Sequence, residues 1–233
     1  MTTEARATLS VTISSIRDPS SPTRLGRILS DLTATVVHDP DVVWRLQMAV
    51  HEIAENLVLA RSTQSVVINA PLEKINLGKW LTELTDAEYQ ACAVPDHRAC
   101  GWSRNAAGQP VSINVEEVGG TLFIQHYVAE ILEPRHCRMV SLSEAQTPDG
   151  WQHQQVIWDL SVTALDAHRS TFTNTIVSRP TRAFVAALEE RGVSFEKAVA
   201  GRGQAVEDHN ALEAPHYAAS VERAALTGQG TRP

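Results

Sequence analysis

The order of its secondary-structure elements constrains this chain more than any single motif does. Between Ser62 and Leu226 the sequence predicts one strand, two short helices, six consecutive strands and a long C-terminal helix. Strands that follow one another across short turns pair as an antiparallel meander, and the apolar face of such a sheet has to be covered. The long helix is the element available to cover it. We therefore predict an α+β fold in which a curved antiparallel sheet wraps around the C-terminal helix, with a cavity between them.

Turn residues separate the predicted strands at regular intervals. Gly119-Gly120 is the strongest of these signals, because two adjacent glycines supply the positive φ angles of a tight hairpin. The six strands are predicted at His97 to Arg104, Pro110 to Val118, Thr121 to Glu133, Cys137 to Gln146, Gln152 to Leu165 and Ser170 to Ser178. The other predicted elements are a strand at Ser65 to Asn69, helices at 76–81, 86–92 and 181–191, and the final helix at Phe195 to Leu226.

Composition and charge restrict the classes of partner. The chain has 233 residues, of which 43% are hydrophobic, and its net charge is -7 without a cluster of lysine and arginine. A nucleic-acid backbone or an anionic membrane would be repelled, so we expect neither as a partner. No apolar run approaches the ~20 residues that a membrane span needs. Three cysteines without a C-x-x-C pair, Cys92, Cys100 and Cys137, favour reduced thiols and a cytoplasmic protein.

The first 62 residues differ in character from the rest of the chain. They predict a short strand around Leu9 to Ile13 and a helical hairpin, whose second helix runs from Val43 to Leu57. We therefore divide the chain into an N-terminal segment at 1–62, a sheet domain at 63–228 and a disordered tail at 229–233.

A motif-like run lies in the second helix of this hairpin. The residues from Leu46 to Asn56 resemble the N box of GHKL-type ATPases, most closely the anti-sigma-factor serine kinases. The resemblance implies that Glu52 and Asn56 share one helix face, where one activates a nucleophile and the other holds Mg²⁺. No Asp-x-Gly-x-Gly nucleotide loop follows, so we expect no productive ATP binding. The simpler interpretation is an amphipathic helix with a solvated face.

A second resemblance covers about 160 residues of the sheet domain. It is carried by Asp86 to Cys92, Asn114 to Glu116, Ile124 to Tyr127, Phe172 to Thr175 and His209 to Arg223. Together these segments resemble the START-like, or SRPBCC, superfamily, and within it bacterial proteins related to polyketide cyclases and dehydrases. The resemblance implies a helix-grip fold around a mainly apolar pocket. It implies no single activity, because the superfamily includes carriers, receptors and cyclases.

Alternation along the strands predicts which residues line the pocket. Apolar residues gather on one face of the predicted strands, with His126 and Asn174 as polar exceptions. A buried polar group without a partner costs ~1 to 3 kcal/mol, so each has a partner in the core or faces a ligand. His126 is the candidate general acid or base, because imidazole titrates near neutral pH. A satisfied core histidine is the alternative. The predicted pocket residues are Ile124, His126, Trp158, Leu160, Asn174 and, from the helix, Tyr217.

The opposite face of the same strands carries a polar set. Asn114, Glu116, Gln125 and Tyr127 would be cross-strand neighbours near the glycine hairpin, and we interpret them as a solvated outer face. A bulge that shifts the register by one residue would exchange the two faces. These four residues would then line the pocket instead.

The C-terminal helix has a stripe at helical spacing that we expect to face the sheet. The stripe consists of Val206, Asn210, Glu213, Tyr217, Ser220 and Ala224. His209, Glu213 and His216 also lie at i, i+4 and i+7, a spacing that a metal ion accepts. No further ligand is placed beside them, so we interpret them as an exposed ion-pair face and expect no metal. We expect no cofactor either.

Three functions follow from this pattern. We expect binding of a hydrophobic small molecule in the cavity, with His126, Asn174 and Tyr217 orienting its polar end. The first alternative is a polyketide cyclase or dehydratase type of enzyme that uses the same pocket. The second alternative is a regulatory protein whose kinase-like N-terminal hairpin binds a protein partner.

Overall fold

A seven-stranded antiparallel sheet forms the centre of the computed structural model, which describes residues 51–105, 108–147 and 150–227. The strand order is β1-β7-β6-β5-β4-β3-β2. Strands β2 to β7 form a meander, and its last strand, β7, pairs with β1. The strands are β1 (Ala60–Ile68), β2 (His97–Arg104), β3 (Pro110–Val118), β4 (Thr121–Leu132), β5 (His136–Thr147), β6 (Gly150–Ala164) and β7 (Ser170–Pro180).

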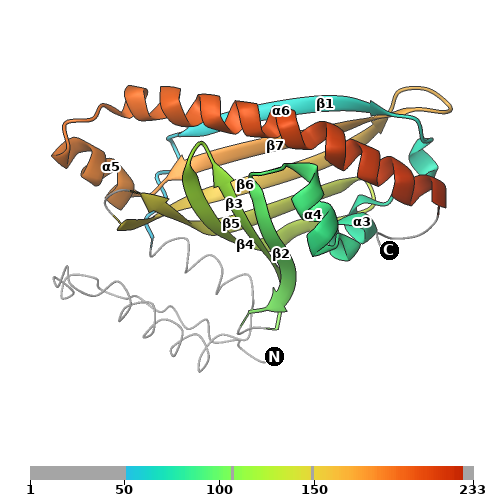
Figure 1. Ribbon diagram of the computed structural model, residues 1–233, viewed down its shortest axis with the longest axis horizontal. Helices are drawn as coiled ribbons and strands as arrows, with labels where there is room; N and C mark the ends of the chain where they lie inside the picture. Colours follow the sequence, from blue (N-terminus) through green and yellow to red (C-terminus); the bar gives the residue numbers. More distant parts are fainter. Residues whose placement is uncertain (1–50, 106–107, 148–149, 228–233) are drawn as a thin grey trace, which may run out of the picture.

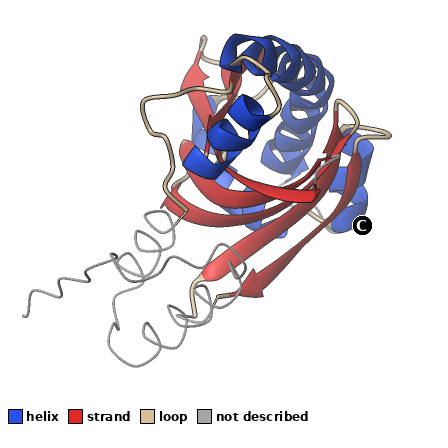
Figure 2. Cartoon of the chain, turned by 90° about the vertical axis from the view of Figure 1, so that its left-hand side faces the viewer, coloured by secondary structure: helices blue, strands red, loops and turns tan. Residues whose placement is uncertain are grey.

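The helices gather on one face of this sheet. They are the 3₁₀ turn η2 (Leu72–Lys74), α3 (Leu77–Glu83), α4 (Asp86–Cys92), α5 (Arg182–Glu190) and α6 (Phe195–Thr227). The long helix α6 packs on β1, β7 and β3, and α3 and α4 pack against it near its C-terminal half (Figure 1). The sheet curves around α6 (Figure 2). The sheet and α6 form a helix-grip arrangement, and the predicted α+β architecture is confirmed. Among the described residues, no helix is long and apolar enough to cross a membrane.

The helix and strand boundaries follow local signals in the sequence. The bounds predicted for β2 and β3 are those of the structure, and α6 ends one residue beyond its predicted end. The side chain of Thr85 accepts a hydrogen bond from the Glu88 amide and so caps α4. Thr181 caps α5 in the same way, and after α5 the chain turns at Gly192 with a φ of 64°.

The hairpin between β3 and β4 depends on the two predicted glycines. Gly119 and Gly120 have φ angles of 60° and 75°, and the strands close directly around them with Val118 opposite Thr121. A Cβ atom at Gly119 would lie 2.6 Å from the Cβ of Ala205 on α6, whereas a Cβ atom at Gly120 would meet nothing within 4 Å. Gly119 therefore allows both the turn and the close approach of α6.

These two glycines give a matched pair of variants. Gly119→Ala and Gly120→Ala both place a side chain at positive φ, but only the first also collides with α6. We expect Gly119→Ala to lose ~1 to 3 kcal/mol more unfolding free energy than Gly120→Ala, since that is the usual cost of overpacking. Urea denaturation measures the difference. Equal losses in the two variants would show that the contact with α6 does not limit this turn.

The main hydrophobic core lies between the sheet and the helices. We call this side of the sheet the inner face and the other side the outer face. Large side chains that are nearly inaccessible fill the core, among them Trp80, Tyr89, Leu160, Phe172 and Tyr217. Each buried side chain of this size contributes ~1.5 to 3 kcal/mol by leaving water. The predicted stripe of α6 is confirmed, because its residues from Val206 to Ser220 are buried.

The outer face is apolar in places as well. Val140, Ile157 and Val177 lie side by side on β5, β6 and β7, and all three are buried. Apolar residues therefore occur on both faces of the central strands, which weakens alternation as a guide to the inner face.

The end of the N-terminal segment differs from the prediction. Residues 51–59 form turns and one isolated bridge, Ile53 to Thr181, rather than the end of a helix. Glu52 has a φ of 47°, so Glu52 and Asn56 do not share a helix face as the N-box resemblance implied. The expected strand and first helix, and the second helix up to residue 50, lie outside the described residues. The domain division stays a prediction; β1 begins at Ala60, before the expected boundary.

Candidate functional site

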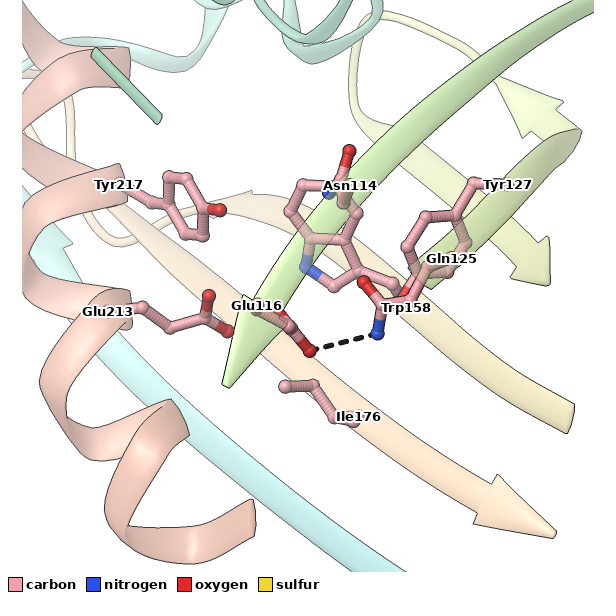
Figure 3. Close-up of a pocket in the computed structure, with 8 residues that line it drawn as sticks. All are labelled: Asn114, Glu116, Gln125, Tyr127, Trp158, Ile176, Glu213 and Tyr217. Carbon is pink, nitrogen blue, oxygen red and sulfur yellow. Dashed lines mark hydrogen bonds between the residues drawn. The ribbon is translucent and has the colours of Figure 1, made fainter. Parts of the chain in front are cut away.

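A small pocket opens between the inner face of the sheet and α6. It is lined by Asn114, Glu116, Gln125, Tyr127, Trp158, Ile176, Glu213 and Tyr217 (Figure 3). Its volume is about 20 Å³, which is room for about one water molecule. Half of the lining residues carry amides or carboxylates, so the pocket is polar at its centre and aromatic at its sides. The lining is thus mixed, and the mainly apolar pocket that the START-like resemblance implied stays a prediction.

The inner face of β4 is the one that the sequence analysis assigned to solvent. Gln125 and Tyr127 line the pocket, and since successive side chains on a strand point to opposite faces, Ile124 and His126 point outward. The prediction that Ile124 and His126 line the pocket is therefore wrong. The reason is that on this strand polar side chains face the pocket. The usual pattern, in which the apolar set faces inward, is therefore reversed.

The other predicted pocket residues lie on the inner face. Trp158 and Tyr217 line the cavity, and Leu160 is buried in the core behind them. Asn174 connects the sheet to α6: its Oδ1 accepts a hydrogen bond from Trp158 Nε1 at 3.0 Å, and its Nδ2 donates to Glu213 Oε1 at 2.9 Å. Asn114, Glu116, Gln125 and Tyr127, the set that a register shift would bring inward, all line the pocket. The function of these residues remains a prediction.

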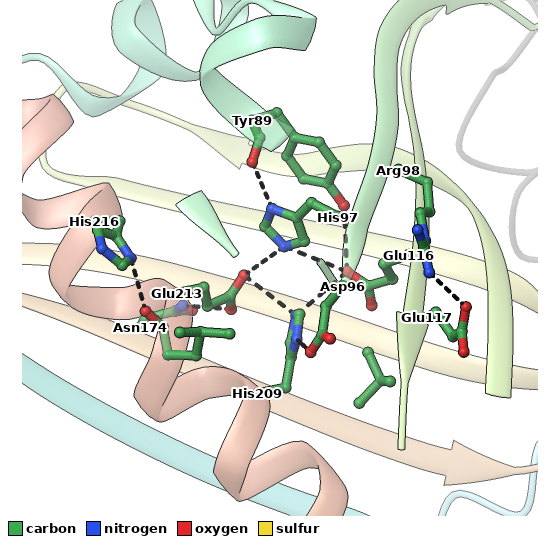
Figure 4. Close-up of polar contacts among 12 residues, drawn as sticks. Tyr89, Asp96, His97, Arg98, Glu116, Glu117, Asn174, His209, Glu213 and His216 are labelled. Atoms are coloured by element: carbon green, nitrogen blue, oxygen red, sulfur yellow. Dashed lines mark hydrogen bonds and ion pairs between the residues drawn. The ribbon is translucent and has the colours of Figure 1, made fainter. Parts of the chain in front are cut away.

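Beside the pocket, two histidines and two carboxylates form a buried cluster. His97 stands on β2, Glu116 on β3, and His209 and Glu213 on α6 (Figure 4). His97 Nε2 lies 3.2 Å from Glu213 Oε2 and 3.8 Å from Glu116 Oε2. His209 Nε2 lies 3.6 Å from each of the same two oxygens. We call these four residues the histidine-carboxylate cluster.

The second nitrogen of each histidine is held by an acceptor outside the cluster. His97 Nδ1 lies 2.6 Å from the backbone carbonyl oxygen of Tyr89, and the Tyr89 ring stacks on the imidazole with a centroid distance of 3.9 Å. His209 Nδ1 lies 2.9 Å from Asp96 Oδ2. Because a carbonyl or carboxylate oxygen only accepts, both Nδ1 atoms carry the proton. Both Nε2 atoms therefore face the carboxylates.

Burial and charge act against each other in this cluster. Burial would lower the pKa of His209, but the carboxylates of Glu213 and Glu116 raise it to about 12. Burial would raise the pKa of Glu213, but the charge of His209 lowers it to about 2. Glu116 likewise has a lowered pKa, since His209 and His97 outweigh its burial. The two carboxylates are thus ionised at neutral pH, and they bring negative charge to one side of the pocket.

The phenols around the pocket are neutral. Burial, followed by the charges of Glu116 and Glu213, raises the pKa of Tyr89, Tyr127 and Tyr217 well above its usual value. These side chains therefore act as hydrogen-bonding and aromatic surfaces rather than as phenolate bases.

Sequence reasoning found part of this cluster and misjudged its exposure. The spacing of His209 and Glu213 was recognised, but the interpretation of His209, Glu213 and His216 as an exposed face is wrong for the first two. His209 and Glu213 are only 4% and 3% exposed, and His216 alone faces solvent. His97 carried no signal, because its partners on β3 and α6 are distant in the sequence.

Comparisons with known proteins find structural similarity at low sequence identity. No family model and no curated protein matches the chain. Zhui aromatase/cyclase from a Streptomyces species is 19% identical with a TM-score of 0.48, and the match covers 73% of this chain and 98% of that chain. A START superfamily protein from Mycobacterium smegmatis is 17% identical with a TM-score of 0.33, covering 63% and 98%. The di-domain ARO/CYC BexL is 16% identical with a TM-score of 0.44, covering 93% and 63%.

Proposed function

We propose that the protein binds a small aromatic molecule carrying a hydroxyl or amino group, in the pocket between the sheet and α6. The observation that carries this proposal is the side-chain oxygen of Gln125. Gln125 Oε1 is buried and has no hydrogen-bond partner, while Gln125 Nε2 donates to Glu116 Oε1 at 2.9 Å. That hydrogen bond fixes the orientation of the amide. Gln125 Oε1 is therefore held as an acceptor without a donor, and a ligand that carries a hydrogen-bond donor would satisfy it.

The walls of the pocket define the rest of the ligand. Tyr127, Trp158 and Tyr217 lie next to one another, with ring centroids 5.7 Å and 5.6 Å apart along the series. Rings at this spacing are already in contact with one another, and together they form an aromatic surface against which the edge or face of another flat ring can pack. The carboxylates of Glu116 and Glu213 favour a ligand that donates hydrogen bonds and disfavour an anion.

The size of the cavity sets a condition on binding. A volume of about 20 Å³ is far below the ~300 to 1,000 Å³ of ordinary ligand pockets. A ring of six atoms can enter only if side chains around the pocket move, as interface side chains commonly do on binding. The ligand is thus small and amphipathic, instead of the hydrophobic molecule expected from the sequence.

Phenol, anisole and benzene test this proposal because they share the aromatic ring and only phenol carries a hydrogen-bond donor. We expect phenol to bind more tightly than anisole or benzene. Gln125→Leu should weaken phenol binding by ~0.5 to 1.5 kcal/mol, about one hydrogen bond, and leave benzene binding unchanged. Ligand-observed NMR titrations give the three affinities. Equal binding of phenol and benzene to the natural chain would contradict the role assigned to Gln125.

Native mass spectrometry of the purified chain complements this titration. A co-purifying compound would reveal the physiological ligand class, and conversion of that compound by the protein would make it an enzyme of the cyclase or dehydratase type.

A further inference from the structure

We propose that the histidine-carboxylate cluster, His97, Glu116, His209 and Glu213, is a binding site for one divalent transition-metal ion, of which zinc fits best. The inference is independent of the ligand proposed for the pocket. It rests on the spacing of the four donor atoms, on the direction of the two histidine nitrogens and on the balance of buried charge.

The donor atoms have the spacing of a metal-coordination shell. The four nitrogen-to-oxygen distances among His97 Nε2, His209 Nε2, Glu116 Oε2 and Glu213 Oε2 are 3.2, 3.6, 3.6 and 3.8 Å. Zinc binds imidazole nitrogen and carboxylate oxygen at ~2.0 to 2.2 Å, which places tetrahedral donors ~3.3 to 3.6 Å apart. The ligand atoms of His97, Glu116 and His209 also all lie within 4.8 Å of one another. His97, Glu116 and His209 therefore form the core of the shell, and Glu213 would have to turn toward them to complete it.

The two Nε2 atoms have no hydrogen-bond partner within the part of the chain that the structure describes. The side chains of His97 and His209 are 0% and 3% exposed, so bulk water has little access to hydrogen-bond their Nε2 atoms. His97 Nε2 lies 3.2 Å from Glu213 Oε2 and 3.8 Å from Glu116 Oε2, and His209 Nε2 lies 3.6 Å from each of these oxygens. Each nitrogen thus has two carboxylate oxygens near it. An ion bound between the four atoms would satisfy both nitrogens together.

The outer contacts of the histidines have the arrangement found around bound metals. A metal-binding histidine almost always donates its other N–H to a carboxylate or a backbone carbonyl, which fixes the ring and its tautomer. Asp96 holds His209 in this way, and the Tyr89 carbonyl holds His97. The flat stack of the Tyr89 ring on His97 further restricts the imidazole. Both Nε2 atoms are therefore directed into the cluster in advance.

Charge balance selects a divalent cation. Glu116 and Glu213 bring two negative charges into a buried site, and uncompensated buried charge is strongly destabilising. Two imidazolium protons or one divalent ion would neutralise them. Asp96 adds a third, partly exposed carboxylate next to His209. Arg202 interacts with the charge of Glu116, but its guanidinium lies over Phe123 and donates to the Val118 carbonyl. Two imidazoles with two carboxylates suit zinc better than calcium or magnesium, which prefer oxygen ligands alone.

The ion would connect three separate elements. His97 comes from β2 at the edge of the sheet, Glu116 from β3, and His209 and Glu213 from α6. Binding would therefore fasten the long helix to the edge of the sheet. Glu116 and Glu213 also line the pocket, so the ion would lie next to any bound molecule.

The first test measures zinc on the natural full-length chain after treatment with a chelator. We expect one equivalent of Zn²⁺ by calorimetry and by elemental analysis after desalting. At a hundredfold excess over the dissociation constant, the thermal midpoint should rise by about 5 °C or more. Co²⁺ in place of Zn²⁺ should give the visible absorption of a four-coordinate site. Less than about 0.1 equivalents of zinc, or no shift of the midpoint, would overturn the proposal.

Variants locate the binding. Glu116→Gln keeps the size of a ligand and should weaken zinc binding at least tenfold, while Asp96→Asn removes only the charge that positions His209 and should weaken it ~10 to 100-fold. His216→Ala is the matched control, because His216 is exposed on the same helix and bonds only to the carbonyl of Leu212. Its affinity should be unchanged. Zinc binding that is lost in His216→Ala and kept in Glu116→Gln would place the ion elsewhere and sink the proposal. Phenol titrations in chelator separate this outcome from the proposed function.

Discussion

Alanine in place of His209 is expected to lower the free energy of unfolding by ~3 to 5 kcal/mol in the presence of a chelator. The imidazole lies within 3.6 Å of both Glu116 and Glu213 and is almost fully buried. Its removal leaves two ionised carboxylates facing each other without a cation, and breaking a buried pair from one side costs this much. Urea denaturation followed by circular dichroism measures the loss.

Two further variants separate this effect from the loss of packing. His216→Ala removes a histidine from the exposed side of the same helix and should change stability by less than ~0.5 kcal/mol. Glu213→Gln added to His209→Ala removes one of the two carboxylate charges that the imidazole no longer neutralises. The double variant should therefore lose less unfolding free energy than the sum of the two single losses. A loss below ~1 kcal/mol for His209→Ala, or strict additivity, would mean that the carboxylates do not depend on this imidazole.

The fold was predictable because its signals are local. The turn at Gly119-Gly120, the cap at Thr85 and the stop at Gly192 each fix a boundary through the backbone conformation of one or two residues. Such signals act in any tertiary context, and β2 and β3 accordingly have their predicted bounds. The order of elements then left few ways to cover one face of the meander.

The inner face of β4 was not predictable in the same way. Both faces of the central sheet bury apolar side chains, as Ile157 and Val177 show on the outer face. Alternation divides the side chains of a strand into two sets but does not tell which set faces the core. On β4 the set with polar side chains faces the pocket, opposite to what apolar burial suggests. Gln125 was consequently assigned to solvent, although it is 3% exposed.

The charged site depends on contacts between residues that are far apart in the sequence. Glu213 and His209 are one helical turn apart and visible as a pair, but the third and fourth members come from the edge strand β2 (His97) and its neighbour β3 (Glu116). Nothing in the local sequence of β2 marks His97 as a partner of α6. The N-box resemblance illustrates the reverse case: the described part of that motif, residues 51–56, forms turns and one isolated bridge instead of a helix.

Replacement of Asn174 is expected to have the second-largest effect. The side chain is fully buried, and it joins Trp158 Nε1 to Glu213 Oε1 through its two ends. Asn174→Ala leaves an indole N–H without an acceptor and a carboxylate oxygen without a donor, at ~1 to 3 kcal/mol for each buried group. We expect a total loss of ~2 to 5 kcal/mol in urea denaturation, with a change in tryptophan fluorescence.

Asn174→Asp divides this loss between its two causes. An aspartate keeps an acceptor for Trp158 but places a carboxylate against Glu213, where an amide donor stood before. Like charges at that distance in a buried site repel strongly, so Asn174→Asp should be at least as destabilising as Asn174→Ala at neutral pH. Thr173→Ala is the control on the outer face of the same strand, where Thr173 bonds only to exposed Ser65, and it should cost less than ~1 kcal/mol. If Asn174→Asp were as stable as the natural chain, the two carboxyls would have to share a proton, and the repulsion from an ionised Glu213 on which this prediction depends would be absent.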